Sequence, residues 1–85
     1  MNLAEFRKDI DNIDDAILEL LDKRMEIVKK IGYLKSQNNE AIYNPKREEE
    51  IIERLNSRKK HITKSGIEEI YNAIFNVSKS LEKGP

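Results

Sequence analysis

Apolar residues recur at alternating spacings of three and four along the first part of the chain. The members of this stripe are Leu3, Phe6, Ile10, Ile13, Ile17, Leu20, Ile27, Ile31 and Leu34. Only an α-helix places such positions on one face, so the pattern predicts a helix over about residues 3–37. At about 1.5 Å per residue this helix would be ~50 Å long, several times a typical globular helix. A helix of this length needs a partner along its length.

Two shorter apolar stripes follow, each behind a capping pattern. Asn44 is a good N-cap and Pro45 suits the first helical position, which predicts a second helix over about residues 45–60 with a cationic C-terminal end. Ser65 begins a capping-box spacing and predicts a third helix over about residues 66–83. No segment alternates as a strand does. The sequence therefore predicts an all-α fold of three helices.

Length and composition favour a single domain, residues 1–85, that associates with a second copy. A chain of this size has a marginal core, and without cysteine it has neither a disulfide nor a thiolate metal site to support that core. The lone His61 has no second histidine or carboxylate at ligand spacing, so we expect no metal.

Charge and hydropathy exclude two further classes of partner. Sixteen Lys plus Arg balance sixteen Asp plus Glu, which argues against a nucleic-acid-binding domain held by a general basic field. Apolar runs are pairs and triplets, far short of the ~20 residues of a membrane span, and the N-terminus lacks the basic-then-apolar pattern of a leader. We expect a cytoplasmic protein that contacts no membrane.

Two cations lie on the apolar face of the first helix. Arg24 stands where the stripe calls for an apolar residue, and a buried guanidinium requires an anion. Lys35 follows eleven residues later and returns to nearly the same helical angle. Each also has a purely structural interpretation: Arg24 could fix helix register or pair with a carboxylate, and Lys35 could be a solvated helix-end lysine.

Other charged and polar residues extend the apolar stripes of the later helices. Glu48 lies one turn before the apolar face of the second helix, and Ser78 and Glu82 continue the apolar row of the third. Taken singly, each fits an edge position between core and solvent. Arg7 is seventeen residues before Arg24, about 25 Å along a straight helix, so one small ligand reaches both only if two copies pair in antiparallel fashion.

These residues together resemble the all-helical (AroQ-type) chorismate mutases over about residues 3–82. The pattern of their first helix is matched by Phe6 to Asp14, Leu20, Leu21, Arg24, Ile31, Gly32 and Lys35. The second-helix motif is matched by Asn44 to Glu48, and Ser78 with Glu82 occupies the third-helix positions. The resemblance implies an intertwined helical homodimer that converts chorismate to prephenate, toward phenylalanine and tyrosine, without a cofactor. That reaction is an intramolecular rearrangement, which needs only a held conformer and a stabilised transition state.

The resemblance also implies a role for each matched residue, beginning with the cations. Arg24 would clamp one substrate carboxylate, and Arg7 from the other subunit would clamp the second. Lys35 would donate to a carboxylate and to the ether oxygen, where negative charge grows as the C–O bond breaks. Arg24 and Lys35, with Glu82, are therefore the expected catalytic residues.

The remaining matched residues would complete the substrate pocket. Glu48 would accept from the ring hydroxyl, Arg47 would stand in the pocket wall, Ser78 would lie near a carboxylate, and Asn44 occupies a position that is acidic in some relatives. Glu82 replaces a Gln that donates to the ether oxygen in many members, so it must be protonated to donate. Turnover should then fall as rising pH removes this proton, and Glu82→Gln should flatten the profile.

Three alternatives share the same residues. Isochorismate pyruvate lyases use this scaffold and need a similar cationic pocket, so product analysis with both substrates has to separate the two activities. A non-catalytic helical dimer that binds or regulates a partner enzyme of the pathway is a second alternative. A third is a coiled-coil-like dimer whose charges only set register, and it predicts that Arg24→Ala abolishes nothing.

Overall fold

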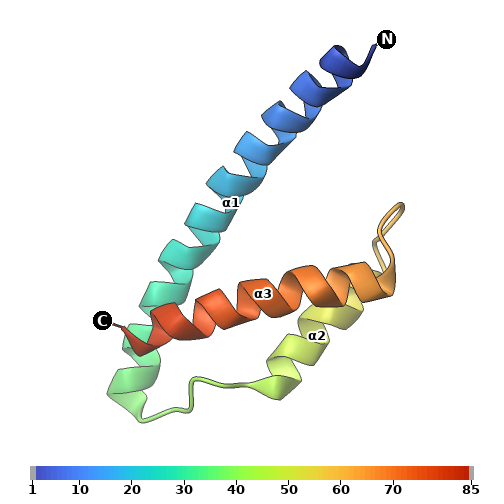
Figure 1. The fold of residues 1–85 in the computed structure, drawn as a ribbon. Coiled ribbons are helices and arrows are strands. Elements are labelled where there is room, and N and C mark those ends of the chain that lie inside the picture. Colours follow the sequence, from blue (N-terminus) through green and yellow to red (C-terminus); the bar gives the residue numbers. More distant parts are fainter. Residues whose placement is uncertain (1, 85) are drawn as a thin grey trace.

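Three helices account for most of the computed structural model, which describes residues 2–84. They are α1 (Leu3–Asn38), α2 (Pro45–Asn56) and α3 (Lys64–Lys83), and no strand occurs within residues 2–84. The predicted all-α class is confirmed. Figure 1 shows α1 as a long rod, with α3 crossing its C-terminal half and α2 beside α3.

Both ends of α1, which is 36 residues long, carry caps that determine where the helix begins and ends. At the N-terminus Asn2 and Glu5 form a capping box: Asn2 Oδ1 accepts from the Glu5 N–H at 3.0 Å, and the Asn2 N–H donates to Glu5 at 3.4 Å. At the C-terminus Asn39 adopts the left-handed conformation (φ 55°), which asparagine tolerates, and Glu40 N–H donates to Lys35 O at 2.9 Å.

The second helix begins as expected and ends earlier than expected. Asn44 is its N-cap, with Oδ1 accepting from the Arg47 N–H at 3.1 Å, and Pro45 is its first residue. The sequence predicted a helix to residue 60, but the Arg58 N–H already turns to Leu55 O at 3.0 Å. Leu55 is the last apolar side chain of this face, so the polar residues beyond it have no packing to hold them in the helix.

The third helix begins at Lys64 rather than at residue 66. Thr63 has an extended backbone and its Oγ1 accepts from the Gly66 N–H at 2.9 Å, so Thr63, and not Ser65, is the N-cap. Both residues are good N-caps. The predicted cap was wrong because the capping-box spacing after Ser65 cannot reveal which hydroxyl has the non-helical backbone.

The core is small and lies where α3 packs against both other helices. Its buried apolar side chains within residues 2–84 are Val28, Ile51, Ile67 and Phe75. The closest approach joins α1 and α3 at Gly32. A Cβ on Gly32 would lie 2.6 Å from the Cα and the carbonyl oxygen of Glu82, so only glycine allows the two backbones to approach so closely.

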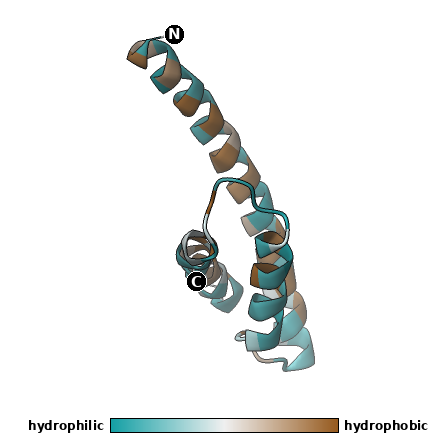
Figure 2. Ribbon diagram, turned by 90° about the vertical axis from the view of Figure 1, so that its right-hand side faces the viewer, coloured by the Kyte–Doolittle hydropathy of each residue, from teal (hydrophilic) through white to brown (hydrophobic). Residues whose placement is uncertain are grey.

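The N-terminal half of α1 extends beyond the other two helices (Figure 1). Its apolar stripe faces solvent: Leu3, Phe6, Ile10, Ile13 and Ile17 are 48–61% exposed. Figure 2 shows these hydrophobic positions recurring along the projecting rod. The radius of gyration is 15.8 Å, whereas a compact chain of this length has about 12 Å. Among the described residues, no helix has both the length and the apolar character needed to cross a membrane.

Candidate active site

A cavity of about 350 Å³ opens between the C-terminal half of α1, the start of α2 and the end of α3. Seven of the eight residues expected at the site line it: Arg24, Lys35, Asn44, Arg47, Glu48, Ser78 and Glu82. The other walls are largely apolar and consist of Ile27, Val28, Ile31, Ile42, Ile51 and Phe75. Charged groups inside apolar walls are screened less by water, so each acts more strongly on a ligand.

Lys35 and Glu82 form the most enclosed ion pair of the cavity. Lys35 Nζ lies 2.7 Å from Glu82 Oε1, and the two side chains are only 17% and 9% exposed. The same ammonium donates to the carbonyl of Ile42 at 2.9 Å. An ammonium has three N–H donors, so one remains for a ligand. Here the Glu82 carboxylate accepts, and it could donate to a ligand only after gaining a proton.

Arg24 is oriented by the hydroxyl of Ser78. Arg24 Nη1 donates to Ser78 Oγ at 2.7 Å. The Ser78 hydroxyl carries one proton, for which the carbonyl of Ile74 at 2.7 Å and the sulfur of Met25 at 3.6 Å compete. The shorter bond to the stronger acceptor takes the proton, which leaves the Ser78 lone pairs for Arg24. Ser78 thus fixes one edge of the guanidinium and leaves its other donors for an anion.

The first turn of α2 forms the opposite wall. The side-chain oxygen of Asn44 caps this helix by accepting a hydrogen bond from the Arg47 N–H. Arg47 is exposed at the rim, and its long contact to Glu50, 3.8 Å, constrains it weakly. Glu48 is half-buried and lines the cavity one turn before the buried Ile51.

Lys79 is a cavity residue that the sequence analysis missed. Its Nζ lies 3.4 Å from Glu48 Oε2 and 4.6 Å from the centre of the Tyr43 ring. Lys79 follows Phe75 by four residues and so shares its helical face, whereas Ser78, the site residue predicted from the sequence, follows Phe75 by three. The four-residue step would have found it.

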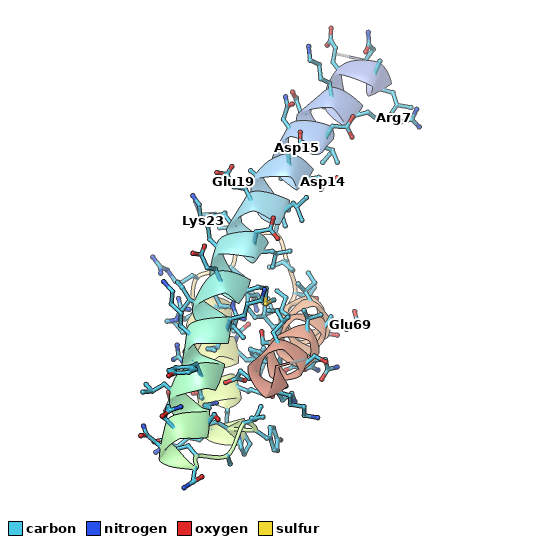
Figure 3. The ribbon with its side chains drawn as sticks, turned by 90° about the vertical axis from the view of Figure 1, so that its left-hand side faces the viewer. Arg7, Asp14, Asp15, Glu19, Lys23 and Glu69 are labelled. Carbon is cyan, nitrogen blue, oxygen red and sulfur yellow. The ribbon has the colours of Figure 1, made fainter. Side chains whose placement is uncertain are left out.

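Arg7 is the predicted site residue that this chain does not bring to the cavity. It lies near the free end of α1, far from α2 and α3, as its label in Figure 3 shows. The expected distance of about 25 Å along the helix from Arg24 explains this separation, because α1 is unbroken between them.

The lining suits a small dianion. Four cations (Arg24, Lys35, Arg47 and Lys79) face two carboxylates (Glu48 and Glu82), which gives the cavity a net charge of +2. Its volume lies at the lower end of the range for small-molecule pockets. Within residues 2–84, no group of three or more His, Cys, Asp or Glu side chains is placed to hold a metal ion.

This geometry agrees with the relatives of the chain. A family model described as chorismate mutase type II matches residues 6–83. The chain belongs to the chorismate mutase type II family. Among curated members, a chorismate mutase from Methanocaldococcus jannaschii is 35% identical over 83 residues, covering 95% of this chain and 84% of the relative.

A solved member of the chorismate mutase type II family has the same fold. The chorismate mutase from Helicobacter pylori, crystallised in complex with prephenate, superimposes with a TM-score of 0.88 at 38% identity, over 95% of this chain and 89% of that one. The bifunctional chorismate mutase/prephenate dehydratase from Aquifex aeolicus is 40% identical over 86 residues, covering 95% of this chain. The chain spans only 24% of the length of that bifunctional relative.

Proposed function

We propose that the protein is a chorismate mutase that rearranges chorismate to prephenate. The observation that carries the proposal is the cavity itself: it sets a net charge of +2 among apolar walls, and its size suits one small molecule. Chorismate carries two carboxylates, so its charge complements that of the cavity. Membership of the chorismate mutase type II family and the relatives named for this activity support the same substrate.

The proposed mechanism uses position and charge alone. The guanidinium of Arg24, held by Ser78, binds one carboxylate with its remaining donors. The remaining N–H of Lys35 donates to the ether oxygen, where negative charge develops as the C–O bond breaks. Glu48 accepts from the ring hydroxyl. Because the reaction is a rearrangement within one molecule, neither a nucleophile nor a cofactor enters this scheme.

Glu82 contributes to this scheme only in its protonated form. In the ion pair with Lys35 its carboxylate is an acceptor and would repel the developing negative charge on the ether oxygen. With a proton it becomes a second donor beside Lys35.

We further propose that the working form is an intertwined homodimer. The chain exposes 7088 Å² of surface, whereas a compact monomer of 10.0 kDa exposes about 5,200 Å². Two chains therefore have roughly 3,800 Å² to bury, which lies within the range of permanent homodimer interfaces. The exposed apolar stripe of α1, with the half-exposed Ile70 and Val77 of α3, supplies the apolar area.

The dimer would also complete the site. In an antiparallel pairing of the α1 helices about a two-fold axis near residues 15 and 16, position 7 of one copy lies opposite position 24 of the other. Arg7 of the second copy would then reach the second substrate carboxylate. The cytoplasmic location and a partner enzyme of the pathway, both expected from the sequence, stay predictions.

Product analysis tests the activity directly. Purified protein is incubated with chorismate, and the products are separated and identified. We expect loss of chorismate with formation of prephenate. A parallel incubation with isochorismate tests the lyase alternative, because that activity would release pyruvate. A folded dimer that leaves chorismate unchanged would refute the proposed function and favour the lyase or the non-catalytic module.

A further inference from the structure

We propose that Lys79 is a positioning residue that holds the Glu48 carboxylate toward the substrate. This inference rests on the proposed function, in which Glu48 accepts from the ring hydroxyl. Lys79 Nζ lies 3.4 Å from Glu48 Oε2, and the two side chains are 28% and 25% exposed. A pair shielded to this degree is screened less than a surface pair, so Lys79 holds the carboxylate in place.

Lys79 has a second contact, with the aromatic ring of Tyr43. The ammonium lies 4.6 Å from the centre of the Tyr43 ring, within the range of a cation–π contact. Tyr43 does not line the main cavity; it borders a neighbouring hollow together with Lys79 and Lys83. The Lys79 ammonium therefore contacts both an aromatic ring and a carboxylate that lines the cavity.

These contacts connect three separate segments of the chain. Tyr43 belongs to the segment between α1 and α2, Glu48 to the first turn of α2, and Lys79 to the last part of α3. Among residues 2–84, Lys79 is the one residue whose cationic group lies within ion-pair distance of the Glu48 carboxylate. Without it, the carboxylate would be free to rotate toward water, because the side chain of Glu48 is partly exposed.

Steady-state kinetics of the protein, residues 1–85, with chorismate test the proposal. Lys79→Met keeps the length of the side chain and removes the charge, and Lys83→Met makes the same change one turn later at an exposed position as the matched control. We expect Lys79→Met to lower kcat/KM by about tenfold, the cost of one weakened hydrogen bond to a charged group. Lys79→Arg should restore most of the loss, and Lys83→Met should behave as the original protein.

A double-mutant cycle with Glu48→Gln separates positioning from direct binding. If Lys79 acts through Glu48, then Lys79→Met changes kcat/KM less than twofold once Glu48 is glutamine. If Lys79 instead touches a substrate carboxylate, the KM rises equally in both backgrounds and the proposal is overturned. Full activity of Lys79→Met would also overturn it. If circular dichroism shows that Lys79→Met does not fold, Lys79→Gln and Tyr43→Leu replace it in the cycle with Glu48→Gln. The same outcomes are expected for these variants.

The activity of the unmodified protein on chorismate distinguishes a failure of this inference from a failure of the proposed function. If it does not convert chorismate, the proposed function fails and the role of Lys79 fails with it. If it converts chorismate and the cycle with Glu48→Gln is additive, only the positioning role fails.

Discussion

Gly32→Ala should separate activity from stability in this protein. A Cβ at Gly32 would lie 2.6 Å from the Cα and carbonyl oxygen of Glu82, whereas ordinary van der Waals contact begins near 3.4 Å. The last turn of α3 must therefore retreat from α1 by the difference, about 0.8 Å. The obstructing atoms are backbone, so no side-chain rotation relieves the clash.

This retreat acts on the ion pair at the centre of the cavity. Lys35 Nζ lies 2.7 Å from Glu82 Oε1. If the displacement falls along this contact, the distance grows to about 3.5 Å, beyond the usual range of a hydrogen bond. Misplacement of a catalytic group by about 1 Å can lower the rate about 100-fold. We expect a loss of this order in kcat/KM.

The cost to stability should be smaller, because the helix propensity of alanine offsets part of the steric cost. Inserting a methyl group into a packed contact costs about 1–3 kcal/mol, and alanine recovers about 1 kcal/mol over glycine within a helix. The net change in the free energy of unfolding is then roughly 0–2 kcal/mol, and the variant should remain folded. Steady-state kinetics and thermal unfolding of the same preparation measure the two effects separately.

Gly66→Ala is the matched control. A Cβ at Gly66 would meet Ile62 Cγ1 and Thr63 Oγ1 at 3.1 Å, which are side-chain atoms, and Gly66 does not line the cavity. This variant should keep its activity. If Gly32→Ala retained full activity while Gly66→Ala did too, the close approach of α1 and α3 would not control the position of Glu82, and our reasoning would be refuted.

Four further predictions test the site and the dimer. Arg24→Ala should leave a folded protein whose kcat/KM is lower by roughly 10- to 100-fold for each charged hydrogen bond lost; retained activity would favour the register interpretation. Glu82→Gln should keep or raise turnover, because an amide donates to the ether oxygen without first gaining a proton; a large loss of activity would contradict the role of Glu82 as donor. Mixing inactive Arg7→Ala and Arg24→Ala subunits should restore one intact site per heterodimer, and failure after proven subunit exchange would argue against shared sites. Ile13→Asp should dissociate the dimer in analytical ultracentrifugation and lower its melting temperature, although Ile13 is 53% exposed in the single chain; no change would contradict an interface through α1.

Local patterns in the sequence predicted the helices because each pattern acts within a few residues. The spacing of the apolar stripe predicted α1, and Asn44 with Pro45 predicted the start of α2. The errors arose where local chemistry allowed two outcomes. Thr63 and Ser65 are both good N-caps, and only the backbone at Thr63 decides between them. The early end of α2 follows Leu55, its last apolar side chain, although the cationic residues beyond it also suited a helix C-terminus.

The candidate site was predicted as a set of residue types and not as a geometry. Arg24 was predicted as a site residue because its guanidinium interrupts an apolar stripe. In the structure Arg24 lies beside Ser78, which is 54 residues later in the chain. Lys79 was missed because its importance depends on Glu48 and Tyr43, which lie on other segments.

Residue types and their spacing were enough to predict the helical class, the breaks near the polar segments and the unusual position of charges within apolar stripes. The close approach that requires glycine at position 32 and the ion pair between Lys35 and Glu82 came only from the arrangement of the helices in space. These features depend on how closely and in which direction helices cross. A crossing is determined by the packing of all three helices together, which residue spacing along one helix does not describe.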